Sequence, residues 1–518
     1  MNIWLREYNW PWNPERYRFP VEQMLLTLFP GERPTYPDTL PRSLVGERGI
    51  LITLARGEKI TTINVLVKLE DRFQNGAVRF PTEKLDEPED KVYHTVSHAL
   101  KRAFYKAGTA LLGHELPWGS LTGVRPVKLP TKAMMAGKTA GQARRELERE
   151  YHVSPPRAAL AVECAQAALD VLNDLRRDGL SLYIGVPFCP TRCAYCSFIS
   201  ADIKGSLARV EPYVDALCRE IELAGALLRE KGLHIASAYM GGGTPTTLSA
   251  EQLDRVLSCA ERTLPMERRA EFTVEAGRPD TLTADKLETL KAHGVGRISI
   301  NPQTREDGVL RAIGRDHTAA QIEEACELAQ KHFGGLVNMD LIAGLPTDTP
   351  EGFGRTLDRV LALNPANITV HTLALKKGSR LTEEGGALPA PEDVEKMLAL
   401  ASDRLRGAGY APYYLYRQKY MSGSFENVGW ARPGAVCAYN IVMMEELQTV
   451  LSLGAGGITK LVDPDNRKII RLNNPKYAKE YLDSWDKIAA DKKTAAEFQA
   501  AVSLSQGTPS GGLLSARA

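Results

Sequence analysis

Three cysteines within eight residues are the part of this sequence best suited to chemistry. Cys189, Cys193 and Cys196 lie in the segment LYIGVPFCPTRCAYCSFIS and have the spacing C-x3-C-x2-C. One loop can bring three thiolates at this spacing into a small volume, as an iron–sulfur cluster requires. Three protein ligands on a four-iron cluster leave one iron able to bind a small molecule. Arg192 lies inside the loop, and we expect it to favour the thiolate forms.

A zinc site is the main alternative for these three thiols. Structural zinc takes four protein ligands, commonly in paired C-x2-C arrangements, and the chain has no second pair. Eight cysteines in 518 residues are too few for a disulfide framework. We therefore expect a [4Fe–4S] cluster held by three cysteines. The other five are scattered: Cys164, Cys218, Cys259, Cys326 and Cys437.

The elements that position the cysteines are predicted by a change of pattern near residue 180. Short apolar strands then alternate with amphipathic helices, for example at 210–230 and 319–331. Strands are expected at 182–186, 235–240, 271–275, 297–301, 336–342 and 367–371. Such β-α repetition implies parallel strands joined by right-handed crossovers. We predict an α/β fold, a partial (β/α)6 barrel, with its site at the carboxyl ends of the strands.

Polar residues follow successive predicted strands. The second strand runs into MGGGTPT, which contains Gly241, Gly242 and Thr244, and glycines let a backbone approach a ligand closely. Glu275 closes the third predicted strand, Gln303 follows the fourth, and Asp340 lies at the fifth. Any one of these would more often be a solvated loop residue. Together at one edge of a parallel sheet, they predict a shared pocket beside the cysteines.

The cysteine segment resembles the signature of the radical S-adenosylmethionine (SAM) superfamily, in which an aromatic residue precedes the last cysteine. The resemblance implies that the open iron chelates SAM and that the reduced cluster cleaves it to a 5′-deoxyadenosyl radical. It also implies that Tyr195 lies near the adenine. The residues implied to hold the methionine amino group are Gly241, Gly242 and Thr244.

The segments together resemble the oxygen-independent coproporphyrinogen III oxidases, also called coproporphyrinogen dehydrogenases, over roughly residues 180–460. The matching motifs continue at 241–245, 313–317 and 340–346, and LTGVRP and YLYRQKYMSG look most like the HemZ branch. The implied SAM contacts are Tyr183, Glu275, Gln303, Arg315 and Asp340. Tyr183 and Arg315 are the implied catalytic residues. The two carboxylates suit ribose hydroxyls, and the guanidinium suits a carboxylate.

Two departures from that family pattern stand out. Gly185 replaces a histidine that usually precedes the cluster segment. In the ENVGW segment, Glu426 and Gly429 replace the histidine and tyrosine of the haem-chaperone branch. The second departure argues against haem binding through this motif, and Trp430 is expected to be a packing residue.

The family resemblance implies an enzyme that oxidatively decarboxylates two propionates of coproporphyrinogen III to give protoporphyrinogen IX. Two SAM would be consumed, and a reducing donor such as flavodoxin or ferredoxin is expected. The alternatives are a haem-binding or trafficking protein and a radical SAM methylase or ring-opening enzyme acting on a tetrapyrrole. Arg417 and Arg432 are candidates to hold propionates, although lone arginines are more often surface residues.

The composition of the chain predicts its class of partner and its location, and changes of pattern along it predict its domains. The 65 basic and 63 acidic residues give a net charge of +2, which indicates no nucleic-acid partner. We expect no membrane span, because no run of about 18 apolar residues occurs, and a cytoplasmic protein, because no secretory segment begins the chain. The predicted division is an N-terminal α+β domain of unknown role (1–175), a radical SAM core (176–384), a small C-terminal domain (385–490) and a disordered tail (503–518).

Overall fold

The chain forms two compact units. The computed structural model describes residues 1–39, 48–196, 201–202, 204–376, 378–384, 388–418, 422–464 and 469–505. The first unit is Met1–Val162, and the second begins at Glu163, inside helix α5 (Pro155–Asp174). The predicted boundary at 175 is the end of that same helix.

The first unit is a four-stranded sheet covered by helices. The sheet order is β1-β2-β3-β4, with the first pair parallel and the other pairs antiparallel. Alternate residues of the second strand, Ile50, Ile52 and Leu54, are fully buried, as expected for a strand with one face on a core. Helix α2 packs on β3 and β4, and α1 packs on α2. The bounds are β1 (Asn2–Tyr8), β2 (Gly49–Arg56), β3 (Ile60–Leu69), β4 (Arg72–Pro81), α1 (Arg18–Leu28), α2 (Glu89–Leu112), α3 (Lys128–Met135) and α4 (Ala140–Tyr151).

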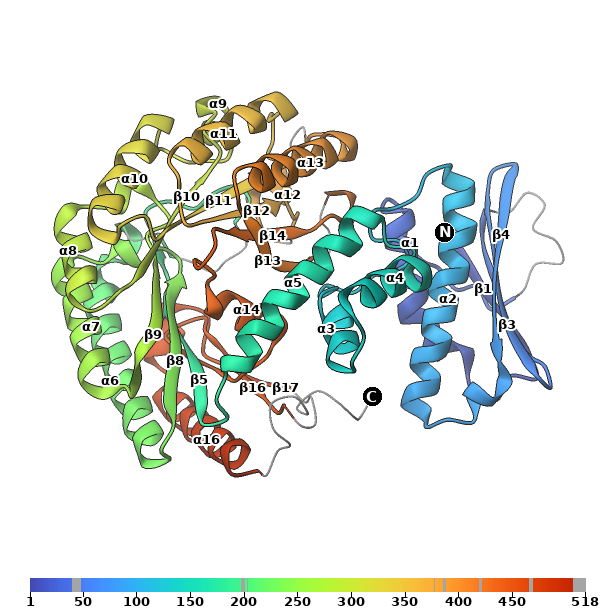
Figure 1. The fold of residues 1–518 in the computed structure, drawn as a ribbon, viewed down its shortest axis with the longest axis horizontal. Coiled ribbons are helices and arrows are strands. Elements are labelled where there is room, and N and C mark those ends of the chain that lie inside the picture. Colours follow the sequence, from blue (N-terminus) through green and yellow to red (C-terminus); the bar gives the residue numbers. More distant parts are fainter. Residues whose placement is uncertain are drawn as a thin grey trace. The chain divides into compact units, whose positions relative to one another are not determined.

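The second unit is built on an eleven-stranded sheet of order β13-β14-β12-β11-β10-β9-β8-β5-β15-β16-β17. Its six central strands are the six predicted from the sequence, and they are parallel neighbours. They are β5 (Gly179–Val186), β8 (His234–Gly242), β9 (Met266–Glu275), β10 (Arg297–Gln303), β11 (Val337–Ala343) and β12 (Asn367–Thr372). Among the described residues the two outermost strands do not pair, so the predicted partial barrel is confirmed as an open α/β sheet (Figure 1).

Helices that follow the parallel strands line the outer side of this sheet (Figure 1). Two of them begin with reciprocal capping boxes, Ser249 with Gln252 and Thr318 with Gln321, which satisfy the first free amides of each helix. The helices are α6 (Leu207–Glu230), α7 (Ala250–Thr263), α8 (Ala284–Ala292), α9 (Asp307–Ala312), α10 (Ala319–Phe333) and α11 (Pro350–Ala362). Within the described ranges, every helix is too short or too polar to cross a lipid bilayer.

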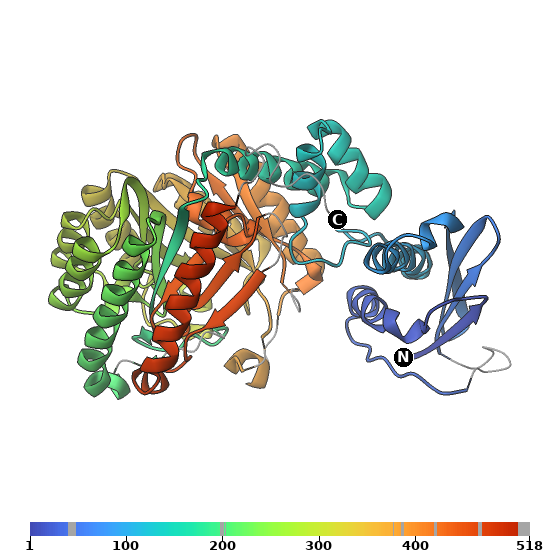
Figure 2. The same cartoon turned by 90° about the horizontal axis from the view of Figure 1, so that it is seen from below.

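The part of the chain after β12 extends the same sheet at both ends. One pair of strands continues it antiparallel beyond β12, while β15 pairs in parallel with β5. The elements are α12 (Arg380–Glu384), α13 (Pro391–Gly407), β13 (Ala411–Tyr416), β14 (Asn427–Ala431), α14 (Ala438–Glu445), β15 (Val450–Leu453), β16 (Ile458–Val462), β17 (Ile469–Asn473), α15 (Ala478–Leu482) and α16 (Trp485–Leu504). The last helix lies beside α6 (Figure 2).

Two predicted boundaries fall within this region. The core and the predicted C-terminal domain share one sheet, and a functional boundary at residue 385 stays a prediction. The predicted tail begins too early, because residues 503–504 still belong to α16. Residues 506–518 of that tail lie outside the described residues.

Candidate active site

One cavity of about 410 Å³ lies at the carboxyl ends of the parallel strands in the second unit. The structure brings most of the predicted site residues together in its lining, although they come from five different β-α connections. These residues are Cys189, Cys193, Tyr195, Cys196, Gly242, Thr244, Glu275, Gln303, Arg315 and Asp340. Two predicted residues, Tyr183 and Gly241, lie on the adjoining strands β5 and β8 and do not line the cavity.

The three clustered thiols share this cavity without meeting at a single point. Cys189 ends the short strand β6 (Phe188–Cys189), and its Sγ lies 3.6 Å from Thr244 Oγ1. All eight cysteines lie in described parts of the chain, and none forms a disulfide. Among the described residues, no group of three or more His, Cys, Asp or Glu side chains is arranged to hold a single metal ion.

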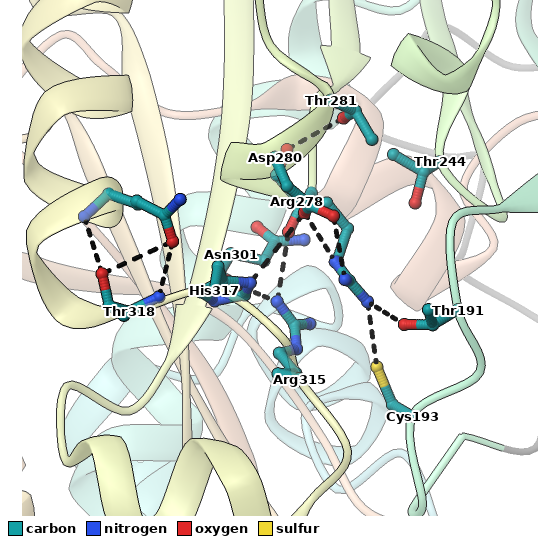
Figure 3. A network of polar contacts seen from close by, with 12 residues as sticks. Thr191, Cys193, Thr244, Arg278, Asp280, Thr281, Asn301, Arg315, His317 and Thr318 are labelled. Carbon is teal, nitrogen blue, oxygen red and sulfur yellow. Dashed lines mark hydrogen bonds and ion pairs between the residues drawn. The ribbon is translucent and has the colours of Figure 1, made fainter.

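Two buried arginines lie close to Cys193, and Figure 3 shows the contact made by Arg278. Arg278 and Arg315 are only 3% and 6% exposed. Nη1 of Arg278 lies 4.0 Å from the Cys193 Sγ and donates to Thr191 Oγ1 at 3.0 Å. Nη2 of Arg315 donates to the Tyr195 hydroxyl at 3.1 Å. Both cations are therefore available to stabilise a thiolate at Cys193.

Arg192 does not have the electrostatic role predicted for it. Its side chain is exposed, and Nη2 donates to the Gly378 carbonyl at 2.8 Å. Neighbourhood in sequence was a poor guide here, because the loop turns this side chain outward. Arg278 was missed altogether, and the available signal was a charged residue three positions after the end of the third predicted strand.

The carboxylate of Glu275 is held at the end of β9. It accepts a hydrogen bond from the Tyr239 hydroxyl at 2.6 Å. A Cβ at Gly241 would lie 3.0 Å from the carboxylate, so the glycine leaves room for it. Burial raises the pKa of Glu275 to about 7, and the nearby Asp340 charge adds to this, while hydrogen bonds from Tyr239 and Gly242 oppose it.

Asp340 contacts a cavity residue that the sequence analysis did not assign. His371 Nε2 lies 3.6 Å from the Asp340 carboxylate, and His371 Nδ1 lies 3.4 Å from the Tyr416 hydroxyl. All three side chains line the cavity. The signal was present, because His371 ends the sixth predicted strand just as polar residues end the others.

Gln303 shows two features of a ligand-binding position. Its backbone has φ +66°, a left-handed conformation that non-glycine residues rarely adopt and that clusters at functional sites. Its buried Oε1 has no hydrogen-bond partner among the described residues. Gly242 adopts φ +115° at the same rim, a conformation suited to glycine alone. An unpaired acceptor and an exposed glycine backbone fit a polar ligand such as SAM.

Tyr183 lies behind the cavity wall. Its ring stacks on Tyr239 with centroids 6.4 Å apart, and Tyr239 in turn stacks on Tyr439 at 4.8 Å. Burial raises the pKa of Tyr183 well above its usual value, with the Glu275 charge as a second cause. Its predicted catalytic role stays a prediction.

At Gly185 and Gly429, two of the positions that depart from the family pattern, the surroundings leave little room for a side chain. A Cβ at Gly185 would lie 3.0 Å from the Ala455 carbonyl oxygen, closer than ordinary contact. A side chain at Gly429 would overlap the ring of Tyr414, its partner across the β13–β14 pair. Trp430 is buried, as expected for a packing residue.

The two arginines considered for propionates do not line the cavity. Arg417 is buried, which corrects the expectation of a surface residue, and burial lowers its pKa to about 10. Its Nε and Nη2 donate to the Ser424 carbonyl at 3.1 and 2.8 Å. Arg432 stacks on the ring of Tyr410 at 4.5 Å.

Known proteins resemble this chain in sequence. Residues 183–360 match the family model of the radical SAM superfamily, which uses a [4Fe–4S] cluster and SAM. The oxygen-independent coproporphyrinogen-III oxidase-like protein HemZ of Bacillus subtilis (strain 168) is 38% identical over 412 residues, covering 79% of this chain and 82% of that protein. The heme chaperone HemW of Escherichia coli (strain K12) is 28% identical over 303 residues, covering 58% of this chain and 75% of that one.

A solved structure of coproporphyrinogen III oxidase (HemN) from Escherichia coli, described as a radical SAM enzyme, is 26% identical with a TM-score of 0.49. It covers 62% of this chain and 73% of that chain. The match to HemZ spans most of both proteins. The chain therefore belongs to the HemZ-like family of oxygen-independent coproporphyrinogen-III oxidase-like proteins, within the radical SAM superfamily.

Proposed function

We propose that the protein is an enzyme that oxidatively decarboxylates two propionates of coproporphyrinogen III to give protoporphyrinogen IX. The observation that carries this proposal is the composition of the single cavity described above. One part of its lining carries the three cysteines and the SAM-binding motifs, and another part carries aromatic and amide side chains suited to a large organic substrate. A radical enzyme needs its cofactor and its substrate close together in one cavity.

The cofactor end is assigned residue by residue. Cys189, Cys193 and Cys196 would hold the [4Fe–4S] cluster. Together with SAM, the cluster supplies an organic radical able to abstract hydrogen from an unactivated carbon. The residues that would hold SAM are Gly242, Thr244, Glu275, Gln303, Arg315 and Asp340, with Tyr195 near the adenine, while Gly241 leaves room for the Glu275 carboxylate.

Arg315 is already oriented for a polar ligand by the backbone. Its Nη1 donates to the carbonyls of Asn301 at 2.8 Å and Gly277 at 3.3 Å, while Nε has no hydrogen-bond partner among the described residues. These carbonyls immobilise the guanidinium without neutralising its charge. A ligand carboxylate would meet a cation whose orientation is fixed before binding.

The substrate end is formed by the antiparallel strands that extend the sheet. The rings of Tyr414 and Tyr416 are nearly parallel, 11° apart, with centroids separated by 6.3 Å. Such rings can cover a pyrrole face, and the amides of Asn427 and Asn440 line the cavity beside them. Lys376 supplies a cation for a substrate carboxylate, and its burial lowers its pKa.

Proton handling is assigned to His371. The imidazole lies between the Asp340 carboxylate and the Tyr416 hydroxyl, so it can hold a proton at Nε2 or exchange one through Nδ1. Burial raises the pKa of Tyr416, which keeps its hydroxyl protonated at neutral pH. His371 would supply the imidazole that Gly185 does not.

A haem chaperone is the second candidate, because relatives with that name share 28–32% identity with this chain. Glu426 replaces the histidine of the chaperone motif, and both ring nitrogens of His371 already face polar partners. A haem ligand would have to come from elsewhere or displace these contacts. A tetrapyrrole methylase uses the same cofactors and differs only in product.

One experiment separates the three functions. Anaerobically reconstituted protein is incubated with SAM, a low-potential donor such as reduced flavodoxin or ferredoxin, and coproporphyrinogen III. We expect protoporphyrinogen IX, detected as protoporphyrin after oxidation. A methylated tetrapyrrole would replace this proposal with the methylase, and tight haem binding without turnover would replace it with the chaperone.

A further inference from the structure

We infer that Arg278, clamped by Asp280, is a positioning residue for the cluster loop and tunes the reduction potential of the cluster bound at Cys193. The inference rests on the proposed assignment of Cys193 as a cluster ligand. It concerns the cofactor and is independent of which tetrapyrrole the enzyme uses.

The geometry of Arg278 leaves little freedom to the guanidinium (Figure 3). Nε and Nη2 donate to the two carboxylate oxygens of Asp280 at 2.9 and 3.0 Å, a bidentate pair. The remaining nitrogen, Nη1, faces the cluster loop and contacts Thr191 Oγ1 at 3.0 Å and Cys193 Sγ at 4.0 Å. One edge of the guanidinium is thus anchored to Asp280 in the 3-10 turn Pro279–Thr281, and the remaining nitrogen contacts the cluster loop.

The charge balance around Cys193 is positive before any cluster binds. Arg278 is paired with Asp280, but no carboxylate of the described residues forms a salt bridge with Arg315. Two cations and one anion leave a net charge of about +1. His317 is buried beside this group, with Nδ1 4.0 Å from Asp280, and burial lowers its pKa to about 4, with the two arginines as further causes. His317 is therefore neutral at physiological pH.

A cluster with three thiolates gains negative charge when it is reduced. Nearby positive charge stabilises the reduced form, and the reduction potential of iron–sulfur clusters depends on net charge and on hydrogen bonds to the sulfurs. Arg278 contributes both, in a site where burial weakens solvent screening. A buried cation that served packing alone would not need to face a ligand sulfur.

Three charge variants test this inference with the full-length reconstituted protein, and no turnover is required. Arg278→Gln removes the cation, Asp280→Asn removes its counter-charge, and Arg192→Gln removes an exposed cation from the same loop as the matched control. Iron content and the potential of the cluster, titrated by EPR without SAM, are measured for each. We expect a more negative potential for Arg278→Gln, a more positive one for Asp280→Asn, and the smallest shift for Arg192→Gln.

Shifts of the same sign for Arg278→Gln and Asp280→Asn, or an unchanged potential in Arg278→Gln with iron retained, would overturn the inference. If Arg278→Gln loses iron, Arg278→Lys decides the case. Recovery of iron and potential by the lysine supports a charge effect, whereas iron loss in both variants means that Arg278 only shapes the loop. Cys193→Ala with a normal cluster would instead refute the ligand assignment itself.

Discussion

The ring of Tyr414 occupies the space into which a side chain at Gly429 would project. The two residues face each other across the antiparallel pair of β13 and β14, and a Cβ at Gly429 would overlap the ring. Tyr414 also lines the cavity, so this packing fixes part of the cavity's aromatic wall.

The steric conflict between a side chain at position 429 and the ring of Tyr414 predicts that substitutions at these two positions are coupled. Gly429→Tyr alone should lower the free energy of unfolding by about 2 kcal/mol or more, because overpacking a buried site forces side chains and backbone to shift. Gly429→Tyr combined with Tyr414→Gly should recover much of that loss, since the second ring vacates the space. Urea denaturation of the four combinations measures the coupling. Additive effects of the two substitutions would show that the two sites do not compete for the same volume.

The cluster assignment predicts that Cys193→Ala abolishes both the cluster and SAM cleavage. Anaerobically reconstituted wild-type protein should hold about four irons per chain. Cys326→Ala is the matched control, because Cys326 is buried in helix α10, where burial raises the pKa of its thiol to about 12, and it should retain wild-type iron. Iron analysis and the visible spectrum check both variants. A normal cluster spectrum in Cys193→Ala would refute the assignment.

Glu275 predicts a pH dependence of stability in the protein without cofactors. Its folded pKa of about 7 lies above the value of about 4.3 for an unfolded glutamate, so the folded state binds more protons between these pH values. The free energy of unfolding should therefore fall as pH rises through this interval. Glu275→Gln should remove this part of the decline and be more stable than wild type at pH 8 by roughly 1–3 kcal/mol.

The measurement is urea denaturation of the wild type and Glu275→Gln at pH 5 and at pH 8. At pH 5 the difference between the two proteins should be smaller than at pH 8, because pH 5 lies only just above the unfolded pKa of about 4.3. If the difference between them is the same at both values, Glu275 does not titrate in this range.

Asp340→Ala should weaken SAM binding while leaving the iron content near that of the wild type. A lost hydrogen bond to a buried hydroxyl costs roughly 1–3 kcal/mol, which corresponds to an affinity loss of about tenfold or more. Asp316→Ala is the matched control, because Asp316 is exposed and lies outside the cavity lining. Equilibrium binding of SAM to the reconstituted proteins gives the comparison, and equal affinities in both variants would place Asp340 outside the SAM site.

Sequence reasoning was most successful where local pattern decides structure. The six parallel strands follow from apolar runs of strand length, and Glu275, Gln303 and Asp340 follow from the rule that such strands end at one edge. Predicting that Asp340 lies at this edge required no knowledge of how distant segments pack. Thus the gathering of these residues in one cavity was largely predictable, and their roles toward SAM stay predictions.

The part of the cavity lined by Tyr414 and Tyr416 was not predictable, because it forms through strand pairings between distant segments. Tyr414 and Tyr416 reach the cavity only because β13 and β14 add antiparallel to β12, and β15 inserts beside β5 from the far end of the chain. The position of Arg278 beside Cys193 could not be predicted, because it depends on contacts with a loop about eighty residues earlier in the chain. Arg192 was considered because it is close in sequence to the cysteines, but its side chain is exposed.

The most direct measurement of the central claim is the release of carboxyl carbon from substrate. Coproporphyrinogen III labelled in its propionate carboxyl groups is incubated anaerobically with reconstituted wild-type protein, SAM and reductant, and with Cys193→Ala in parallel. We predict labelled carbon dioxide in a ratio of two per tetrapyrrole converted, with SAM cleaved in proportion, and none from the variant. SAM consumption by the wild type with all label retained in the tetrapyrrole would contradict the account.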